Sequence, residues 1–301
     1  MRMRNKTLAI LTPTFNRQNK LLFLYESLKK QKCKDFNWYI IDDGSNDSTE
    51  TLIETFSLPN SEIIYIKKEN GGKHTAINKG MEFIVEDLVI IVDSDDTLSS
   101  DAVSIICDDY KKYKNLSDIA GISYCKVNKQ TGSVVGDSYK ENFFKGNYIS
   151  TIMNSKIKGD KAEVFKNLVL KKYPFPIFEN EKFLAESIVW IRIAADFNFL
   201  YSNKSFYLCE YLPDGLTSTG RKKIFTSPNG YALYSFSMMR KGVRFDLVVK
   251  YMFLFIISSK ACGKHGPKFD YHLSFFKKVM YCLLFIPSSF LFHIWKRRYV
   301  K

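Results

Sequence analysis

Short apolar runs alternate with longer amphipathic segments through the first 115 residues of the chain. The pattern predicts strands over residues 7–11, 37–41, 62–66 and 88–92, and helices over residues 20–30, 48–56, 75–85 and 101–113. Strands and helices in strict alternation form right-handed βαβ units. We therefore predict an α/β fold with a Rossmann-like, mostly parallel central sheet flanked by helices.

The alternation weakens after residue 117. Residues 119–127 and 132–135 are typical of a hairpin whose turn covers residues 128–131. Helices are expected over residues 162–170 and 185–195, and one or two edge strands over residues 199–211.

The last sixty residues differ from the rest in charge. The chain has 301 residues, 46% of them hydrophobic, and a formal net charge of +14. Residues 241–301 contain twelve Lys or Arg against two acids, a net charge of +10. The basic clusters alternate with bulky apolar runs at 251–257 and 279–286, which favours a helical tail that associates with a membrane surface over one that binds nucleic acid. A pair of core helices with solvated basic flanks remains the alternative.

The apolar segment 279–295 is uncharged apart from His293. We expect Pro287 to interrupt it, so that it falls short of the ~20 apolar residues of a spanning helix and lies in the membrane interface. The N-terminal apolar run is too short for a secretory signal, and the six cysteines form no CxxC pair. We therefore expect a cytoplasmic protein, peripherally associated with the cytoplasmic membrane, with reduced thiols.

Each predicted strand of the first half ends in a polar loop, at residues 12–14, 42–45, 70–73 and 93–96. Parallel sheets bind ligands at the carboxyl ends of their strands, so these loops are expected to share one edge. The doubled Asp42-Asp43 favours an acceptor of hydrogen bonds from a nucleobase or ribose over the alternative of a well-capped turn. In the third loop, the Gly71 and Gly72 amides and Lys73 can approach a diphosphate at a helix N-terminus.

The loop after the fourth strand contains three acids, Asp93, Asp95 and Asp96. Carboxylates this close repel each other unless a cation neutralises them, which indicates a divalent metal. Oxygen ligands beside a diphosphate suit Mn²⁺ or Mg²⁺. A solvated acidic turn is the alternative.

These motifs, in this order, resemble the inverting family 2 glycosyltransferases of the GT-A fold, over residues 7–215. The resemblance rests on Thr12-Pro13-Thr14-Phe15-Asn16-Arg17, Ile41-Asp42-Asp43-Gly44-Ser45, Asn70-Gly71-Gly72 and the acids of residues 93–96. It implies that residues 1–115 form the nucleotide-sugar-binding half, residues 116–220 the acceptor-binding half and residues 221–301 a basic, aromatic helical tail.

The same resemblance suggests roles for individual residues. Pro13 and Asp43 would border the nucleobase, Lys73 and Asn78 would lie near ribose or phosphate, and Thr14, Asn16 and Asp93 would also contribute to nucleotide binding. Asp95 would contact ribose and metal, and Asp96 would ligate the metal.

An inverting transfer also needs a base that takes the proton of the acceptor hydroxyl. In the family this is commonly an Asp in a Glu-Asp pair, with an Arg several residues later. Here Ser187 stands where that Asp is expected, and measuring back from Arg192 favours Glu186, with Glu181 and Glu179 as weaker candidates. A surface carboxylate at a helix N-terminus is the alternative interpretation of Glu186.

Other positions carry weaker expectations. We expect Trp190 in the core, the aromatic residues of segment 173–178 along the acceptor cleft, and the lone His74 to be an incidental polar residue.

The resemblance implies transfer of a sugar from a nucleoside diphosphate sugar, expected to be a UDP-sugar, to a hydroxyl of a saccharide acceptor. The tail adds the expectation that this acceptor is lipid-linked and belongs to cell-surface polysaccharide assembly. Two alternatives remain: a haloacid-dehalogenase-type phosphatase using Asp93 and Asp95, and a non-catalytic membrane-bound protein that binds nucleotide-sugar.

Overall fold

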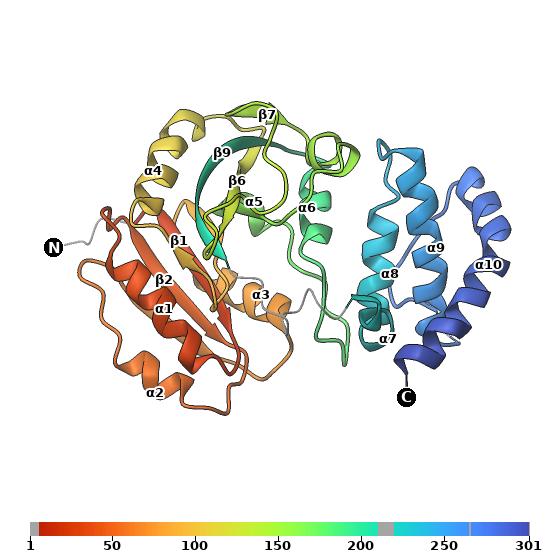
Figure 1. Cartoon of the computed structure of the whole chain (residues 1–301), viewed down its shortest axis with the longest axis horizontal. Coiled ribbons are helices and arrows are strands. Elements are labelled where there is room, and N and C mark those ends of the chain that lie inside the picture. The colour runs from red at the N-terminus through yellow and green to blue at the C-terminus, as the bar shows by residue number, and fades with distance from the viewer. Residues whose placement is uncertain (1–5, 210–219, 265, 301) are drawn as a thin grey trace.

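The computed structural model describes residues 6–209, 220–264 and 266–300. Figure 1 shows a sheet with flanking helices at the left and centre, and a group of helices, α7 to α10, at the right. The strands are β1 (Leu8–Thr14), β2 (Phe36–Asp42), β3 (Ile63–Lys67), β4 (Leu88–Ile91), β5 (Thr97–Leu98), β6 (Ile119–Asn128), β7 (Phe144–Gly146), β8 (Lys161–Lys166) and β9 (Asn198–Cys209). The helices are α1 (Gln18–Lys29), α2 (Thr49–Glu54), α3 (Lys73–Phe83), α4 (Ala102–Tyr113), a π-helical turn at Ile149–Asn154, α5 (Asn167–Leu170), α6 (Ser187–Ile193), α7 (Lys223–Thr226), α8 (Pro228–Ser237), α9 (Phe245–Ala261) and α10 (Phe275–Tyr299).

The first half of the sheet is parallel, as predicted. Strands β3, β2, β1 and β4 lie side by side in this order, with Leu8 of β1 opposite Phe36 and Leu88. Every residue of β1 is buried, because the sheet separates two apolar clusters: Leu8 and Ile10 face one cluster, and Ala9 and Leu11 face the other. The four predicted strands and four predicted helices of residues 7–113 are all present.

The second half is mixed rather than parallel. In the sheet, β8 is antiparallel to both β4 and β6, and β9 is parallel to β6 but antiparallel to β5 and β7. The expected helix over residues 162–170 is therefore wrong over most of its length, since residues 161–166 form β8 and only α5 is helical. The main chain of β8 is hydrogen-bonded to β4 on one side and to β6 on the other. This pairing between distant segments outweighs the local helix propensity.

Two further expectations need correction. The hairpin after β6 is reduced to a single bridge between Val127 and Val134, without a second strand. Strand β9 is not an edge strand, because β6 pairs on one side of it and β5 and β7 on the other. The last two residues of the predicted segment, 210 and 211, lie outside the described residues.

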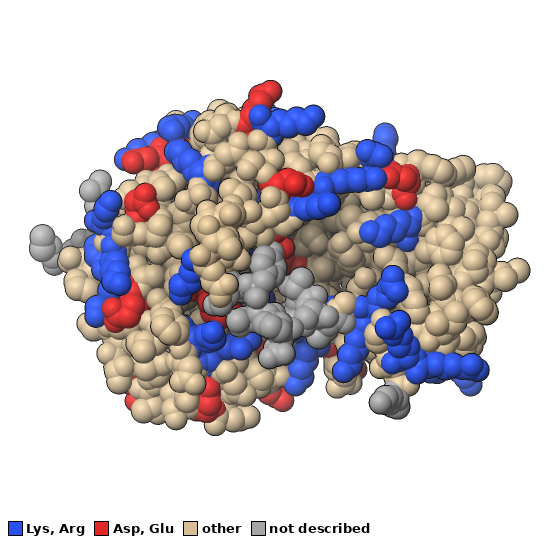
Figure 2. Space-filling model, in the orientation of Figure 1, with Lys and Arg blue, Asp and Glu red and all other residues tan. Residues whose placement is uncertain are grey.

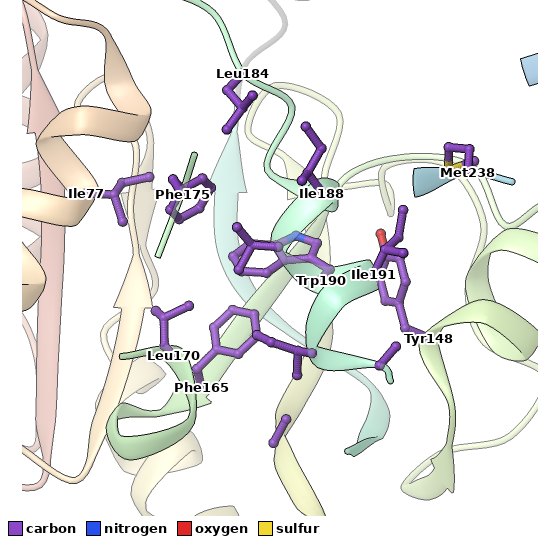
Figure 3. Close-up of a cluster of buried hydrophobic side chains, with 14 of the residues drawn as sticks. Ile77, Tyr148, Phe165, Leu170, Phe175, Leu184, Ile188, Trp190, Ile191 and Met238 are labelled. Atoms are coloured by element: carbon purple, nitrogen blue, oxygen red, sulfur yellow. The ribbon is translucent and has the colours of Figure 1, made fainter. Parts of the chain in front are cut away.

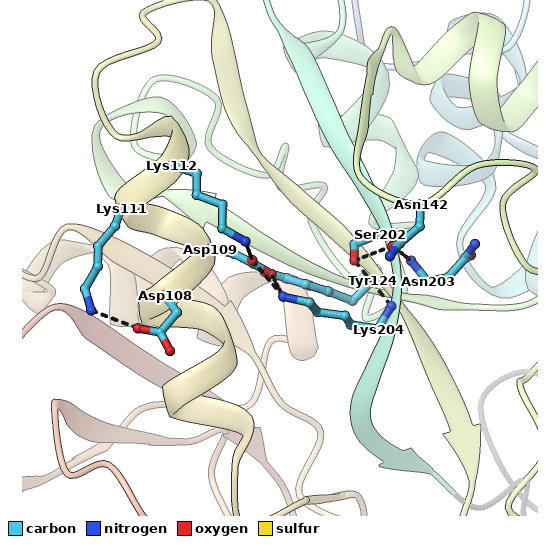
Figure 4. Close-up of polar contacts among 9 residues, drawn as sticks. All are labelled: Asp108, Asp109, Lys111, Lys112, Tyr124, Asn142, Ser202, Asn203 and Lys204. Atoms are coloured by element: carbon cyan, nitrogen blue, oxygen red, sulfur yellow. Dashed lines mark hydrogen bonds and ion pairs between the residues drawn. The ribbon is translucent and has the colours of Figure 1, made fainter.

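A buried carboxylate joins helix α4 to the second half of the sheet. Asp109 is fully buried and accepts hydrogen bonds from Lys112, from Lys204 of β9 and from the Tyr124 hydroxyl of β6, as Figure 4 shows. Its neighbour Asp108 pairs with Lys111 on the surface. The burial requires this compensation, because an unpaired carboxylate at that depth would be costly.

Helix α6 connects the sheet to the C-terminal helices. Trp190 is buried at the centre of one apolar cluster, as predicted for a core residue, and Figure 3 shows it between Phe165 and Phe175 on one side and the region of Met238 on the other. Helix α9 belongs to the same cluster, with Met252 and Phe255 fully buried. For α9, the alternative of a core helix is therefore correct.

Helix α10 is continuous through Pro287, so the expected interruption is wrong. Proline removes one hydrogen bond to the carbonyl of Leu283, yet the helix runs over 25 residues and packs on α9 through buried Met280 and Ser288. By length and composition alone, α10 is long and apolar enough to cross a membrane. Only 11% of its most apolar 18-residue stretch is buried.

One face of α10 leaves large apolar side chains exposed. Residues 276, 279, 283, 286, 290 and 294 recur at intervals of three or four, and all are large, hydrophobic and exposed. The visible face of this end of the molecule is largely uncharged in Figure 2, in contrast to the charged surface around the sheet. A contiguous exposed apolar face of this kind marks an interaction surface.

We predict that Asp109→Asn lowers the free energy of unfolding by about 1–3 kcal/mol, because Lys204 and Tyr124 lose a charged acceptor in the interior. Asp108→Asn is the matched control and should leave stability nearly unchanged, as expected for an exposed pair. Urea unfolding of both variants measures the difference. Equal effects of the two substitutions would contradict the structural role of Asp109.

Candidate functional site

A cleft of about 670 Å³ lies where β1, β2 and β4 end, and both halves of the sheet line it. Of the residues singled out in the sequence, the cleft is lined by Pro13, Thr14, Asp43, Lys73, Asp93, Asp95, Asp96 and Glu186. Asn16 and Asn78 are not among its lining residues. Loops that are far apart in the sequence are thus brought together at one edge of the sheet, as the parallel topology requires.

The two asparagines have structural partners. Asn16 adopts a positive φ of 52°, and its side-chain oxygen accepts the Asn46 amide at 2.9 Å. The Asn78 amide donates to the Phe175 carbonyl at 2.8 Å and accepts the Phe175 N–H at 2.9 Å. Asn78 therefore holds the segment after α5 against α3, and its amide does not point into the cleft to meet ribose or phosphate.

Asp42 and Asp43 organise the neighbouring loops. Asp42 is fully buried and accepts from the Ser45 amide and the Tyr65 hydroxyl, each at 2.8 Å. Asp43 accepts the Gly71 and Gly72 amides at 2.9 and 2.6 Å, and Lys68 at 2.7 Å. In this structure the Gly71 and Gly72 amides are therefore bonded to the Asp43 carboxylate and not free for a diphosphate.

Gly72 sets the distance between two loops of the cleft. Its φ of +96° favours glycine, and a Cβ there would lie 2.2 Å from the Lys182 carbonyl oxygen. The loop after β3 is thus in main-chain contact with the segment that leads to Glu186.

The acidic loop after β4 is anchored from the other half of the sheet. Tyr207 of β9 accepts the Asp93 amide at 3.0 Å and is hydrogen-bonded to the Asp96 carboxylate. Burial, together with the charges of Asp93 and Asp95, raises the pKa of Asp96 to about 7, although Lys126 opposes the shift. Burial is the main cause of this shift, so the Asp96 carboxylate is costly to ionise without a further cation.

Lys73 lies between the acidic loop and the predicted base. Its ammonium group forms ion pairs with Asp93 and with Glu186 Oε1, the latter at 2.6 Å. Burial opposes the charge, but the two carboxylates raise the pKa of Lys73 above its ordinary value. Lys73, the first residue of α3, thus links the acidic loop to Glu186 across the cleft. It is not a free cation waiting for a phosphate.

The structure separates Glu186 from the weaker candidates for the base. Glu181 is buried and accepts the main-chain amides of Asn229 and Gly230 at 2.8 Å each, so that it caps the first turn of α8. Glu179 is exposed and lies 3.9 Å from Lys268. Neither lines the cleft, whereas Glu186 does.

The aromatic segment 173–178 does not line the cleft, contrary to expectation. Phe175 and Phe178 are buried in the core, and Figure 3 shows Phe175 in the cluster around Trp190. The Tyr173 ring lies under the guanidinium of Arg192. Apolar packing against α6 accounts for these residues.

Three residues near the cleft were not expected from the sequence. Lys126 of β6 and Glu163 of β8 line the cleft, and Tyr207 of β9 is bonded to the acidic loop that lines it. Lys126 lies 4.0 Å from the centre of the Tyr207 ring and opposes the charge of the acidic loop. Burial and the charge of Glu186 raise the pKa of Glu163 to about 7. No sequence motif includes these positions. They could have been predicted only by knowing which strands reach the cleft and which side chains of those strands face it.

Two buried polar atoms of the cleft have no hydrogen-bond partner within the part of the chain that the structure describes. They are Thr14 Oγ1 and His74 Nδ1, on side chains that are at most 3% exposed. Burial lowers the pKa of His74, which favours the neutral imidazole. Buried polar groups are nearly always bonded, so a polar ligand or an ordered water is expected beside these atoms. His74 is thus a more informative residue than its sequence context suggested.

The comparison with protein families is decisive for this arrangement. The model of glycosyl transferase family 2 matches residues 9–168, just over half of the chain. The chain belongs to glycosyl transferase family 2. The match includes all four loops at the ends of the parallel strands and stops shortly before Glu186.

Two curated relatives of this family 2 protein come from bacteria. "Glycosyltransferase GlyA" of Streptococcus pneumoniae is 30% identical over 165 residues, which are 54% of this chain and 21% of the relative. "GalNAc(5)-diNAcBac-PP-undecaprenol beta-1,3-glucosyltransferase" of Campylobacter jejuni is 28% identical over 206 residues, 67% of this chain and 62% of the relative. The chain therefore spans less than two thirds of the length of either.

A solved structure shows the fold over most of the family 2 chain. "S. aureus TarS 1-349 in complex with UDP-GlcNAc" superposes with a TM-score of 0.62, covering 93% of this chain and 81% of that chain at 17% identity. The mixed sheet flanked by helices is accordingly the GT-A architecture, and the C-terminal apolar helix follows it.

We predict that Glu163 makes this protein less stable as the pH rises. Its folded-state pKa of about 7 lies above the ordinary 4.5, so its contribution to stability is complete below about pH 4.5 and is lost as the pH rises through 7. Replacing it by Gln should reduce the loss of unfolding free energy between pH 5 and pH 8 by about 1–3 kcal/mol.

Denaturant unfolding at the two pH values measures this difference. Glu82→Gln, on the exposed side of α3, is the control and should leave the pH dependence unchanged. An unaltered dependence in the Glu163 variant would show that another group carries it.

Proposed function

We propose that this protein transfers a sugar from a nucleoside diphosphate sugar to a hydroxyl group of a saccharide acceptor, with inversion at the anomeric carbon. The observation that carries the proposal is the meeting of the acidic loop and Glu186 in one cleft, with Lys73 between them. Such a cleft offers carboxylates for a cation on one side and a base on the other, the two requirements of the reaction.

The donor nucleotide is proposed to occupy the side of the cleft formed by β1, β2 and α3. Thr14 Oγ1 and His74 Nδ1 would there obtain the hydrogen-bond partners that they lack. Pro13 and Asp43 line the same side. A UDP-sugar is the preferred candidate, because the TarS fragment with the same fold is in complex with UDP-GlcNAc.

The acidic loop fits a divalent cation, which we propose to be Mn²⁺ or Mg²⁺. No group of three His, Cys, Asp or Glu side chains converges among the described residues. Two carboxylates, Asp95 and Asp96, are nevertheless enough, since such ions take their remaining ligands from substrate phosphates and water. Burial is the main cause of the raised pKa of Asp96, and a bound cation would stabilise its charged form. The bound metal would offset the charge that develops on the departing nucleoside diphosphate.

Glu186 is the proposed general base. Lys73 binds Oε1 and so fixes the orientation of the carboxylate, while Oε2 accepts the proton of the acceptor hydroxyl. The acceptor oxygen forms its bond to the anomeric carbon as the bond from that carbon to the diphosphate breaks on the opposite face. Lys73 and Lys126 both stabilise the charge of the neighbouring Asp93.

The acceptor is proposed to be a lipid-linked saccharide, and the enzyme to be held at the cytoplasmic membrane in cell-surface polysaccharide assembly. The Campylobacter jejuni relative is named for an undecaprenol-linked substrate. The exposed apolar face of α10 has basic residues near both ends, Lys277 and Lys278 at one and residues 296–298 at the other. That pattern suits contact with an anionic membrane surface.

The phosphatase alternative is not favoured. The glycosyl transferase family 2 model covers residues 9–168, which include Asp93 and Asp95. The family assignment also leaves no reason to prefer a non-catalytic binding protein, because Glu186 faces the cleft in spite of Ser187.

Two substitutions test the chemistry separately. Asp96→Ala should abolish the Mn²⁺-dependent thermal stabilisation by the UDP-sugar that stabilises the wild type most. Glu186→Gln should keep this stabilisation and lower kcat about 10²–10⁴-fold, because it removes only the base. Glu179→Gln is the control and should retain normal turnover. Near-normal turnover of Glu186→Gln would refute the assignment of the base.

The exposed face of α10 can be tested without disturbing the core. Replacing Leu283, Ile286 and Phe290 by Ser should leave the melting temperature nearly unchanged and reduce binding to anionic vesicles at least about tenfold, as expected for the loss of this apolar area. Leu168→Ser, an equally exposed site far from α10, is the control. Cosedimentation with vesicles measures binding, and unchanged binding of the triple variant would contradict membrane contact through α10.

A further inference from the structure

A second cavity, of about 560 Å³, lies among the C-terminal helices and is separate from the catalytic cleft. Tyr231 of α8 and Tyr251 of α9 line one side, and Leu291 and Trp295 of α10 line the other. The cavity shares no lining residue with the cleft. Its wall is mostly aromatic and aliphatic, which suits an apolar chain.

Two cations complete the lining of this cavity, Arg221 and Lys250. The guanidinium of Arg221 lies 4.5 Å from the centre of the Trp295 ring, and the ammonium of Lys250 lies 5.3 Å from that of Tyr251. Both side chains are exposed, and neither forms a salt bridge with an acid in the described part of the chain. Cations held on aromatic rings at an apolar cavity match an amphiphilic anion.

The cavity is connected to the cleft by a short stretch of chain. Arg221 lines the cavity and Lys223, two residues later at the start of α7, lines the cleft. Lys223 lies over the Phe183 ring, 3.8 Å from its centre, and Phe183 is three residues before Glu186. Figure 1 shows α7 beside α8, at the border between the helical group and the loops of the sheet. A molecule with its anionic group at Arg221 could therefore extend a polar substituent toward Glu186.

We propose that this cavity binds a membrane lipid with a phosphate or diphosphate headgroup. Arg221 and Lys250 bind the phosphate, and the apolar chain lies against Tyr231, Leu291 and Trp295. The exposed face of α10 lies on the same helix and brings the cavity to the bilayer from which such a lipid comes. The inference rests on the proposed function in one respect, since it makes this lipid the carrier of the acceptor saccharide.

The test uses the full chain and decyl phosphate below its micellar concentration as the probe. Isothermal titration calorimetry should show binding of decyl phosphate, and at least about tenfold weaker binding of both inorganic phosphate and decanol, because each lacks one half of the recognised chemistry. The emission of Trp295 should change on binding, since Trp38 and Trp190 are buried elsewhere. In Trp295→Phe this signal should vanish.

Variants locate the site. Arg221→Gln combined with Lys250→Gln should weaken decyl phosphate at least about tenfold, whereas Lys241→Gln, an exposed cation outside the cavity, should not. Equal affinity for decyl phosphate and inorganic phosphate would reveal a plain anion site, and equal affinity for decyl phosphate and decanol a plain apolar one. Either result would overturn the proposal, and so would wild-type binding by the double variant.

A parallel titration with UDP-sugar and Mn²⁺ keeps the two proposals apart. Donor binding by the wild type without decyl phosphate binding would refute the lipid site and leave the proposed function standing. Decyl phosphate binding without binding of any donor would support the lipid site and refute the proposed function.

Discussion

Crowding of negative charge at the ends of the parallel strands is the constraint on which the rest of this structure depends. The topology of β1, β2 and β4 brings the loops that contain Asp43, Asp93 and Asp96 to one edge. Isolated carboxylates at such depth would be too costly, so each has compensation. Asp43 accepts hydrogen bonds from main-chain amides and Lys68, Asp93 is ion-paired with Lys73, and Asp96 has the Tyr207 hydroxyl and the charge of Lys126. Burial still raises the pKa of Asp96, one of the two residues that we assign to the metal.

The residues that offset the charge of the acidic loop also come from the second half of the sheet. Tyr207 and Lys126 reach the acidic loop only because β9 and β6 run parallel to each other next to it. The buried Asp109 then attaches α4 to the same two strands. The mixed part of the sheet thus supports the acidic loop as well as adding a wall to the cleft.

The sequence was sufficient for the parallel half, where strong alternation and local loops agree with the topology. It was insufficient where tertiary pairing decides. Residues 161–166 have no clear period, because β8 is buried between two strands, and so Glu163 was placed on a helix that does not exist there. Pro287 was expected to interrupt the apolar segment 279–295, but α10 continues through it and packs on α9. The acids of the site were evident from motifs, whereas Lys126 and Tyr207 became evident only from the pairing of distant strands.

The close approach of Gly72 to the Lys182 carbonyl has a consequence for how this enzyme could diversify. The main chains of Gly72 and Lys182 are in contact with no side chain between them. The distance between the loop after β3 and the segment carrying Glu186 therefore cannot be changed by replacing a side chain at this contact. Changes in substrate preference would have to arise from side chains farther along either wall. Gly72 therefore sets the width of the cleft at this point, while the rest of the cleft surface is free to vary.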